Sequence, residues 1–327
     1  MTSPDFLVFG LGPAGCAAAI FAARAGASVA LAGFPVEGLK FGEHLPSEAN
    51  PLLDELGVQP SAVSCAGVVN WWNGVESSQD ALFHPLGEGR FVGRPAFEER
   101  LLAQARELGV TVWEGFRLAR REGSMVTLQG SETVMLRPAS IIDATGRSAA
   151  IARHFGAVRK RWDRLTALGL RNPSNHPDQR LLVEPVAEGW WYTCPLPGEE
   201  RSFVFLTDAD LPQFEKARTP QGWRKLMGPR MSSIFGHRKP QTPAVATAGS
   251  ANLKPSKGEG WVAIGDAAMS FDPLASRGLH HALASAREAV LGTDSRTGGF
   301  ETYLKQKRRY YGLERRFEGE LFWERRR

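Results

Sequence analysis

The chain has 327 residues, of which 43% are hydrophobic and 23% charged, a composition that suits a globular protein with a large core. Its formal net charge is +5, and no apolar run approaches the length that spans a membrane. The chain begins with a predicted strand rather than a signal-peptide pattern, and its three cysteines are too widely spaced for a metal motif. We therefore expect a cytoplasmic protein without a membrane span, a bound metal or a nucleic-acid partner.

The first predicted strand ends in a glycine-rich turn. Residues 5–9 form an apolar run that predicts a buried parallel strand, and an Ala-rich helix follows up to Gly26. Between them the sequence reads Gly10-Leu11-Gly12-Pro13-Ala14-Gly15, which matches G-x-G-x-x-G. In this pattern the first glycine permits the tight turn, the second lets the backbone approach a pyrophosphate, and the third allows close packing of helix on strand. Because the helix N-terminus would hold the phosphate, the stretch predicts dinucleotide binding.

The second predicted strand, residues 28–33, lacks the acidic residue that usually binds the adenosine ribose. That acid is expected at Ala32 or Gly33, and Glu37 is the next one along the chain. We therefore predict a weaker grip on the adenosine end of the cofactor, and a purified protein that is partly free of it.

The remaining segments predict two interleaved domains. Helices are predicted at 50–57 (with Asn50 as N-cap), 97–108, 220–227, 279–291 and 299–323, the last of them strongly basic. Strands are predicted at 68–72, 81–84, 90–93, 110–113, 116–121, 125–129, 133–136, 141–146, 244–248 and 261–264, and throughout 165–207. Because antiparallel sheet interrupts the nucleotide-type elements twice, we expect a mixed α/β fold. The predicted parts are a Rossmann-type domain (1–66, 94–164 and 244–298), a substrate-binding sheet domain (67–93 and 165–243) and a C-terminal basic helix (299–327).

A second glycine-containing turn identifies the dinucleotide. Residues 261–283 run from a strand through a loop into a helix, with marked positions at Gly265, Asp266, Pro273, Gly278, Leu279 and His280. This stretch resembles the second flavin motif of the FAD-dependent monooxygenases related to p-hydroxybenzoate hydroxylase. The resemblance implies that Asp266 binds the ribityl chain, that Pro273 lies beside the flavin ring, and that the helix N-terminus faces the N1–C2=O edge of the flavin. Reduced flavin is anionic at that edge, where a helix N-terminus stabilises it, so FAD is the expected cofactor.

The turn Asp143-Ala144-Thr145-Gly146-Arg147-Ser148 narrows the resemblance. It is similar to the group that contains the flavin-dependent halogenases and the flavoproteins that mature tryptophylquinone cofactors. Further similarity to the maturation branch lies in 42–46, 93–97, 189–197, 272–274 and 310–326. The resemblance also implies that Arg94 contacts the pyrophosphate or the ribityl chain of FAD.

Two positions bear on halogenation, which in the related halogenases needs a lysine and a W-x-W-x-I-P motif. The lysine position here reads Cys65-Ala66-Gly67, and the motif position reads Trp190-Trp191-Tyr192-Thr193-Cys194-Pro195. Both departures favour oxygen transfer over halogenation, but Lys40 lies near enough in sequence to keep the halogenase open as an alternative.

Aromatic and titratable residues supply candidates for the substrate pocket and for catalysis. Side chains alternate across a strand, so one tryptophan of each adjacent pair would face an aromatic substrate. The pocket candidates are Trp71, Trp72, Trp190, Trp191, Tyr192 and His84. The catalytic candidates are Glu43 and His44, as a base for an indole N–H or a phenol, and Arg277, beside an anionic flavin or substrate.

We interpret the sequence as that of an FAD-dependent oxidoreductase, foremost a monooxygenase that hydroxylates an aromatic or indole-like substrate through a flavin C4a-hydroperoxide. The substrate is a small molecule or a tryptophan of a peptide or partner protein. The alternatives are a flavin-dependent halogenase, an enzyme of the geranylgeranyl-reductase type, and a flavin-binding assembly factor without activity. Because no second Rossmann unit exists, either NAD(P)H binds transiently or a partner flavin reductase supplies the electrons. The basic C-terminal residues suggest an acidic protein partner.

Overall fold

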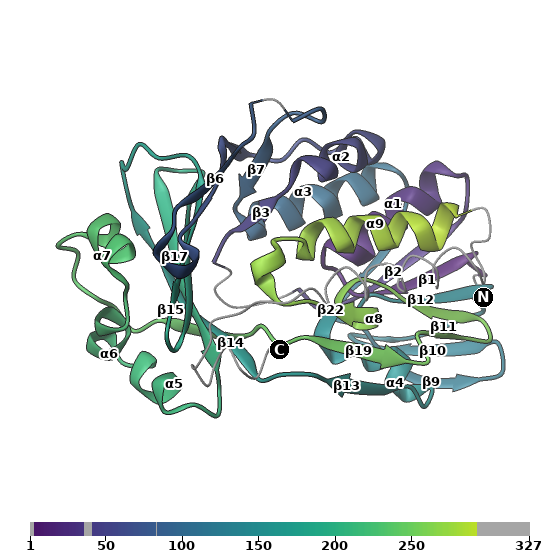
Figure 1. Ribbon diagram of the computed structural model, residues 1–327. Coiled ribbons are helices and arrows are strands. Elements are labelled where there is room, and N and C mark those ends of the chain that lie inside the picture. The colour runs from purple at the N-terminus through teal and green to yellow at the C-terminus, as the bar shows by residue number, and fades with distance from the viewer. Residues whose placement is uncertain (1–2, 36–40, 83, 293–327) are drawn as a thin grey trace.

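The computed structural model of the protein describes residues 3–35, 41–82 and 84–292. Glu37, Lys40 and the basic helix predicted at 299–327 lie outside the described residues. Figure 1 shows two large sheets that meet in the middle of the molecule, with long helices above one and short helices beside the other. None of the described helices is long and apolar enough to cross a membrane.

A mainly parallel six-stranded sheet forms the Rossmann-type part of the molecule. Its strands, in spatial order, are β20 (Lys257–Gly258), β21 (Trp261–Ala263), β12 (Ser140–Asp143), β1 (Phe6–Phe9), β2 (Val29–Gly33) and β8 (Thr111–Glu114). Three long helices lie side by side above it (Figure 1): α1 (Pro13–Arg24), α3 (Arg94–Glu107) and α9 (Gly278–Leu291). Because α1 is Ala-rich and packs between α3 and α9, it is buried along most of its length.

A seven-stranded sheet, antiparallel except for the β15–β5 pair, forms the second part. Its spatial order is β18 (Ala244–Thr247), β14 (Leu165–Pro173), β17 (Glu200–Asp208), β16 (Gly189–Leu196), β15 (Leu181–Val186), β5 (Gly67–Asn70) and β6 (Ser77–Asp80). The short helices α5 (Pro212–Ala217), α6 (Pro220–Lys225) and α7 (Pro229–Phe235) cover its outer face (Figure 1). Since side chains alternate along each strand, separate hydrophobic clusters form on the outer and inner faces.

Three small sheets and several short helices complete the described part of the molecule. The small sheets are β3–β7–β4 (Glu43–Leu45, Gly89–Val92, Ala62–Cys65), β13–β19–β22 (Val158–Arg161, Ala251–Lys254, Met269–Ser270) and β11–β10–β9 (Thr133–Leu136, Met125–Gln129, Arg117–Glu122). The short helices are α2 (Asn50–Leu56), α4 (Ala150–His154) and α8 (Gly265–Ala268), with 3-10 turns η1 (Ser47–Ala49), η2 (Trp72–Gly74), η3 (Gly146–Ser148) and η4 (Pro273–Ala275).

The expected fold class is confirmed, and the chain passes repeatedly between the two large sheets. β5 and β6 interrupt the parallel sheet between β2 and β8, and strands β14 to β18 interrupt it again between β12 and β20. The domain boundaries given above stay a prediction.

Some local expectations are wrong. The strand expected at 68–72 ends at Asn70, where a 3-10 turn follows, and the next strand is β6 rather than 81–84, since Ala81 and Leu82 lie in a turn. Asn50 is the first residue of α2 rather than its N-cap. Its side-chain amide instead donates to the carbonyl oxygens of Leu86 (2.8 Å) and Glu88 (3.0 Å), so it ties a loop to the helix.

Candidate active site

A cavity of about 880 Å³ lies between the carboxyl ends of the parallel strands and the inner face of the seven-stranded sheet. Open α/β sheets bind ligands at this edge, and the volume falls within the roughly 300–1,000 Å³ typical of ligand sites. The cofactor residues predicted from sequence that line it are Gly10, Gly12, Pro13, Ala14, Arg94, Asp266, Pro273, Gly278 and Leu279. The other three, Gly15, Gly265 and His280, lie outside its lining.

The turn between β1 and α1 presents bare backbone to the cavity. Gly10 has φ +118°, and a Cβ there would lie 2.2 Å from the carbonyl oxygen of Ala144, so only glycine fits. A Cβ on Gly12 would meet no atom within 4 Å, because Gly12 borders the cavity. Gly15 acts through packing, since a Cβ there would lie 1.8 Å from the carbonyl oxygen of Gly10. The first turn of α1 holds no acidic residue, and its N-cap Gly12 brings no side chain to cap it, so an anion fits there.

A second long helix, α9, also points its N-terminus at the cavity. Gly278 and Leu279 begin the helix and line the cavity, and the first turn holds no acidic residue. Two helix N-termini, each with a partial positive charge, thus face one cavity. This arrangement fits FAD, because the cofactor carries a pyrophosphate in the middle of the molecule and, at its flavin end, a ring that becomes anionic on reduction.

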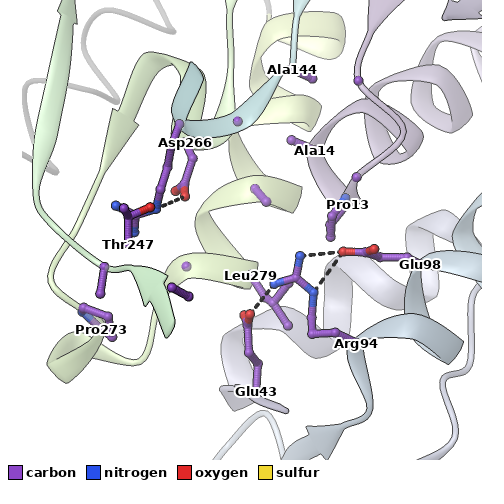
Figure 2. A pocket seen from close by; sticks show the side chains of 18 of the residues that line it. Pro13, Ala14, Glu43, Arg94, Glu98, Ala144, Thr247, Asp266, Pro273 and Leu279 are labelled. Atoms are coloured by element: carbon purple, nitrogen blue, oxygen red, sulfur yellow. Dashed lines mark hydrogen bonds and ion pairs between the residues drawn. The ribbon is translucent and has the colours of Figure 1, made fainter. Parts of the chain in front are cut away.

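Asp266, on α8, contacts the turn formed by residues 143–148. Its carboxylate (Figure 2) lies 3.2 Å from Nε of Arg147. Its backbone carbonyl accepts a hydrogen bond of 2.7 Å from Arg159. Arg147 lies in the turn that follows β12. The last residue of β12, Asp143, is buried. Asp143 accepts hydrogen bonds from the Thr145 hydroxyl (2.6 Å) and from the backbone N–H of residue 152 (2.8 Å), and burial raises its pKa. Asp143 therefore holds the turn in shape, and Arg147 extends from the turn to Asp266.

Arg94 is engaged by two carboxylates rather than left open toward the cavity. Figure 2 shows its guanidinium between Glu43 and Glu98, and it forms ion pairs with both. Burial lowers the pKa of Arg94, but the two carboxylates outweigh this and leave it raised, so the guanidinium stays charged. All three side chains line the cavity.

Two side-chain contacts, one made by His44 and one by Arg277, lie next to each other at the start of α9. The Nδ1 atom of His44 lies 2.9 Å from the hydroxyl of Ser276, and both residues line the cavity. Burial lowers the pKa of His44 to about 4, against the opposing effect of Glu48, so the imidazole is neutral near pH 7. Arg277 lies outside the cavity lining, and its guanidinium donates to the Glu48 carboxylate at 2.8 Å. His44 on β3 and Glu48 on η1 therefore anchor Ser276 and Arg277, the two residues that precede α9.

The inner face of β16 supplies an aromatic wall. Trp190 and Tyr192 line the cavity with ring centroids 5.9 Å apart, and burial holds the pKa of Tyr192 well above its usual value. Trp191 points to the outer face, where its ring lies 4.8 Å from Trp223. Three other candidates lie outside the cavity lining: Trp71, Trp72 and His84. The indole of Trp71 donates to Glu76 at 2.8 Å, and His84 is exposed in a turn.

The position where related halogenases carry lysine holds a buried thiol. Cys65 is 2% exposed and packs in the inner-face cluster with Trp190 and Cys194. Burial raises the pKa of both thiols, that of Cys194 to about 12, so both stay protonated near neutral pH. They act here as packing residues.

Sequence reasoning missed several residues that line the cavity with polar groups. These are Glu98, Arg147, Ser276 and Thr247. Arg147 stood inside a motif that the sequence already marked, and Glu98 lies one helical turn after Arg94, a spacing that favours an ion pair. Nothing in the sequence indicates that Ser276 meets His44, because 232 positions separate them.

Comparison with known proteins finds flavin-dependent enzymes. No protein-family profile matches the chain. It is 27% identical over 282 residues to LodB of Marinomonas mediterranea, named as an FAD-dependent oxidoreductase, with 78% of this chain and 76% of that protein covered. It is 26% identical over 337 residues to the tryptophan 2-halogenase of Chondromyces crocatus, covering 91% of this chain and 62% of the halogenase. The solved structure of the peptidyl tryptophan dihydroxylase QhpG superposes with a TM-score of 0.78 at 23% identity, covering 99% of this chain and 79% of that one.

The fold, the cavity and these relatives together define an FAD-dependent oxidoreductase. Within that class, the chain is similar to the halogenase-like flavoproteins, which confirms the resemblance inferred from the sequence.

Proposed function

We propose that the protein is a monooxygenase that hydroxylates an aromatic, indole-like group, carried by a small molecule or by a tryptophan of a polypeptide. One observation supports this most directly. The cavity runs from the two helix N-termini to a wall formed by Trp190 and Tyr192, so a flavin site and an aromatic site share one space. Aromatic side chains favour stacking with an aromatic substrate. The relative named peptidyl tryptophan dihydroxylase supports the indole class.

Bound FAD supplies the reaction with O₂ and the transfer of one oxygen atom. The protein's residues supply the surroundings. The N-termini of α1 and α9 bind negative charge, and the apolar inner face of the seven-stranded sheet excludes water. Neutral His44, held by Ser276, is available to accept a hydrogen bond from an indole N–H or a phenol as oxygen is transferred.

A halogenase is the second candidate, and the relative named tryptophan 2-halogenase favours it. Delivery of hypohalous acid in the related halogenases needs a lysine. Among the residues that the structure describes, no lysine lines the cavity, and Cys65 holds the expected lysine position. Lys40 lies outside the described residues, and it is the lysine that keeps halogenation open as an alternative.

The deciding experiment supplies holoprotein with NADH, a flavin reductase, isotopically heavy O₂ and either free indole or a short tryptophan peptide. We expect mass spectrometry to show heavy oxygen in the product, with or without bromide, and to show the same for Lys40→Ala. A brominated product that disappears in Lys40→Ala would instead establish the halogenase. The reaction with NADH alone tests whether a separate reductase is needed, and we expect turnover to depend on the reductase.

A further inference from the structure

The seven-stranded sheet ends in an unprotected edge strand. Among the described residues, β18 bonds only to β14, and its sequence, Ala244-Val245-Ala246-Thr247, holds no charge and no proline. Its register with β14 is regular at all four positions, and Val245 is 50% exposed. The opposite edge strand, β6, reads Ser77-Ser78-Gln79-Asp80, with a charge at its end. Proteins usually protect sheet edges with charges, prolines or bulges, so β18 is open to pairing with a further strand.

This open edge forms the lip of the cavity. A row of directly opposed residues crosses four strands, from Trp190 on β16 through Leu206 and Ala167 to Ala246 on β18. All four line the cavity. A strand added beside β18 would place the residue opposite Ala246 next in this row, with its side chain on the cavity face. Because the row narrows to two alanines at this end, it leaves room for a large incoming side chain.

The surroundings of the edge favour an acidic partner. Beside the C-terminal end of β18 the chain reads Lys160-Arg161-Trp162-Asp163-Arg164, and the backbone N–H of Ala248 bonds to Leu165 at 2.9 Å. Lys160 and Arg161 are exposed. Arg164 is exposed and pairs with Asp210 at 3.8 Å, whereas Asp163 is turned inward to the backbone N–H of residue 250 at 3.1 Å. Trp162 is 62% exposed. An extended segment that runs along β18 and past its C-terminal end would therefore approach positive charge and an exposed indole.

We propose that β18 binds an extended, acidic segment of a partner polypeptide by strand addition, and that this segment presents an aromatic side chain to the cavity opposite Ala246. Backbone hydrogen bonds supply affinity in such complexes, and side-chain positions supply specificity. The proposal names the substrate class of the proposed monooxygenase and rests on that function for its chemistry. The docking itself does not depend on oxygen transfer.

A substitution at Val245 can block strand addition at β18 without disturbing the existing sheet. Because the N–H of Ala248 points to β14, alternation along the strand points the N–H groups of Ala246 and Ala244 the same way and those of Val245 and Thr247 outward. Val245→Pro therefore removes a donor that an added strand needs, without removing a bond to β14. Proline is tolerated on edge strands when its missing N–H faces solvent. Val245→Thr keeps the N–H and the branched side chain, so it is the matched control.

The test measures binding of labelled peptides to full-length holoprotein by fluorescence anisotropy. The probe is a peptide with one tryptophan flanked by glutamates, and its counterpart has lysines in their place. We expect Val245→Pro and the lysine exchange each to weaken binding by about tenfold or more, while Val245→Thr stays close to the parent protein. Equal binding to the Pro and Thr variants would overturn the proposal. If the peptide binds to the parent protein and to Val245→Thr but not to Val245→Pro, and is never oxygenated, the docking proposal is supported and the proposed monooxygenase activity is contradicted.

Hydrogen exchange on the full-length protein checks that the edge is open before a partner arrives. We expect the amides of Val245 and Thr247 to exchange rapidly in the free protein and to become protected when the acidic tryptophan peptide is added. Protection already present in the free protein would mean that another part of the chain or a second copy covers β18, and it would overturn the proposal.

Discussion

At the scale of single residues, two glycines of one turn have different tasks. Gly10 has a positive φ and lies against Ala144, whereas Gly12 borders open cavity. We expect Gly10→Ala to lower the free energy of unfolding by about 2–4 kcal/mol through strain and overlap. Gly12→Ala should stay within about 0.5 kcal/mol of the parent apoprotein, yet bind FAD more weakly, because its methyl group takes space near the phosphate. Urea unfolding of the apoproteins and FAD titration separate the effects, and unchanged FAD affinity in Gly12→Ala would place the pyrophosphate elsewhere.

The surroundings of Arg94 bear on how the cofactor's charge is met. A guanidinium between two carboxylates leaves a group with net negative charge, which does not attract a phosphate. The N-terminus of α1 is therefore the better source of phosphate affinity in this structure. The contact between Arg94 and FAD that the resemblance implies stays a prediction, because both carboxylates already engage the guanidinium.

At the scale of elements, turns and periodicity were predictable and side-chain direction was not. The helix over 97–108 and the meander over 116–136 are confirmed to within a few residues, because apolar periodicity and glycines mark them locally. Alternation predicted that one of Trp190 and Trp191 faces the cavity, but only the packing of α6 against the outer face decides which. Likewise, the place of Arg277 before α9 did not reveal that its side chain meets Glu48, on a distant segment.

That ion pair leads to a prediction about α9. Glu48 partly neutralises Arg277 at the end of the helix that faces the cavity, and Arg277 holds the pKa of Glu48 low together with local hydrogen bonds, against the effect of burial. Glu48→Gln removes a negative charge beside Arg277 and the N-terminus of α9, which favours the anionic reduced form of a bound flavin. We expect the two-electron midpoint potential to rise by roughly 10–30 mV, which spectroelectrochemistry on the holoprotein would measure.

The same helix supplies the control for this experiment. Glu55 pairs with Arg287 at 2.6 Å, further along α9 and away from the cavity. Glu55 lies on α2, so Glu55→Gln removes a comparable charge beside α9, and we expect it to leave the potential unchanged. Equal shifts in the two variants would show that net charge, rather than the N-terminus of α9, sets the potential.

At the scale of the whole molecule, both large sheets line the cavity. A bound cofactor would therefore contact elements that lie far apart in the sequence. A ligand that binds only the folded state stabilises it by about 2.7 kcal/mol at one hundred times its dissociation constant. Because FAD would span the junction, we expect this stabilisation to reach the seven-stranded sheet as well as the Rossmann-type sheet. Hydrogen exchange with and without FAD would show slower exchange in β16 and β17 as well as in β1 and β2. Slowing confined to β1 and β2 would mean that the two sheets unfold independently, and that the aromatic wall contributes little to holding the cofactor.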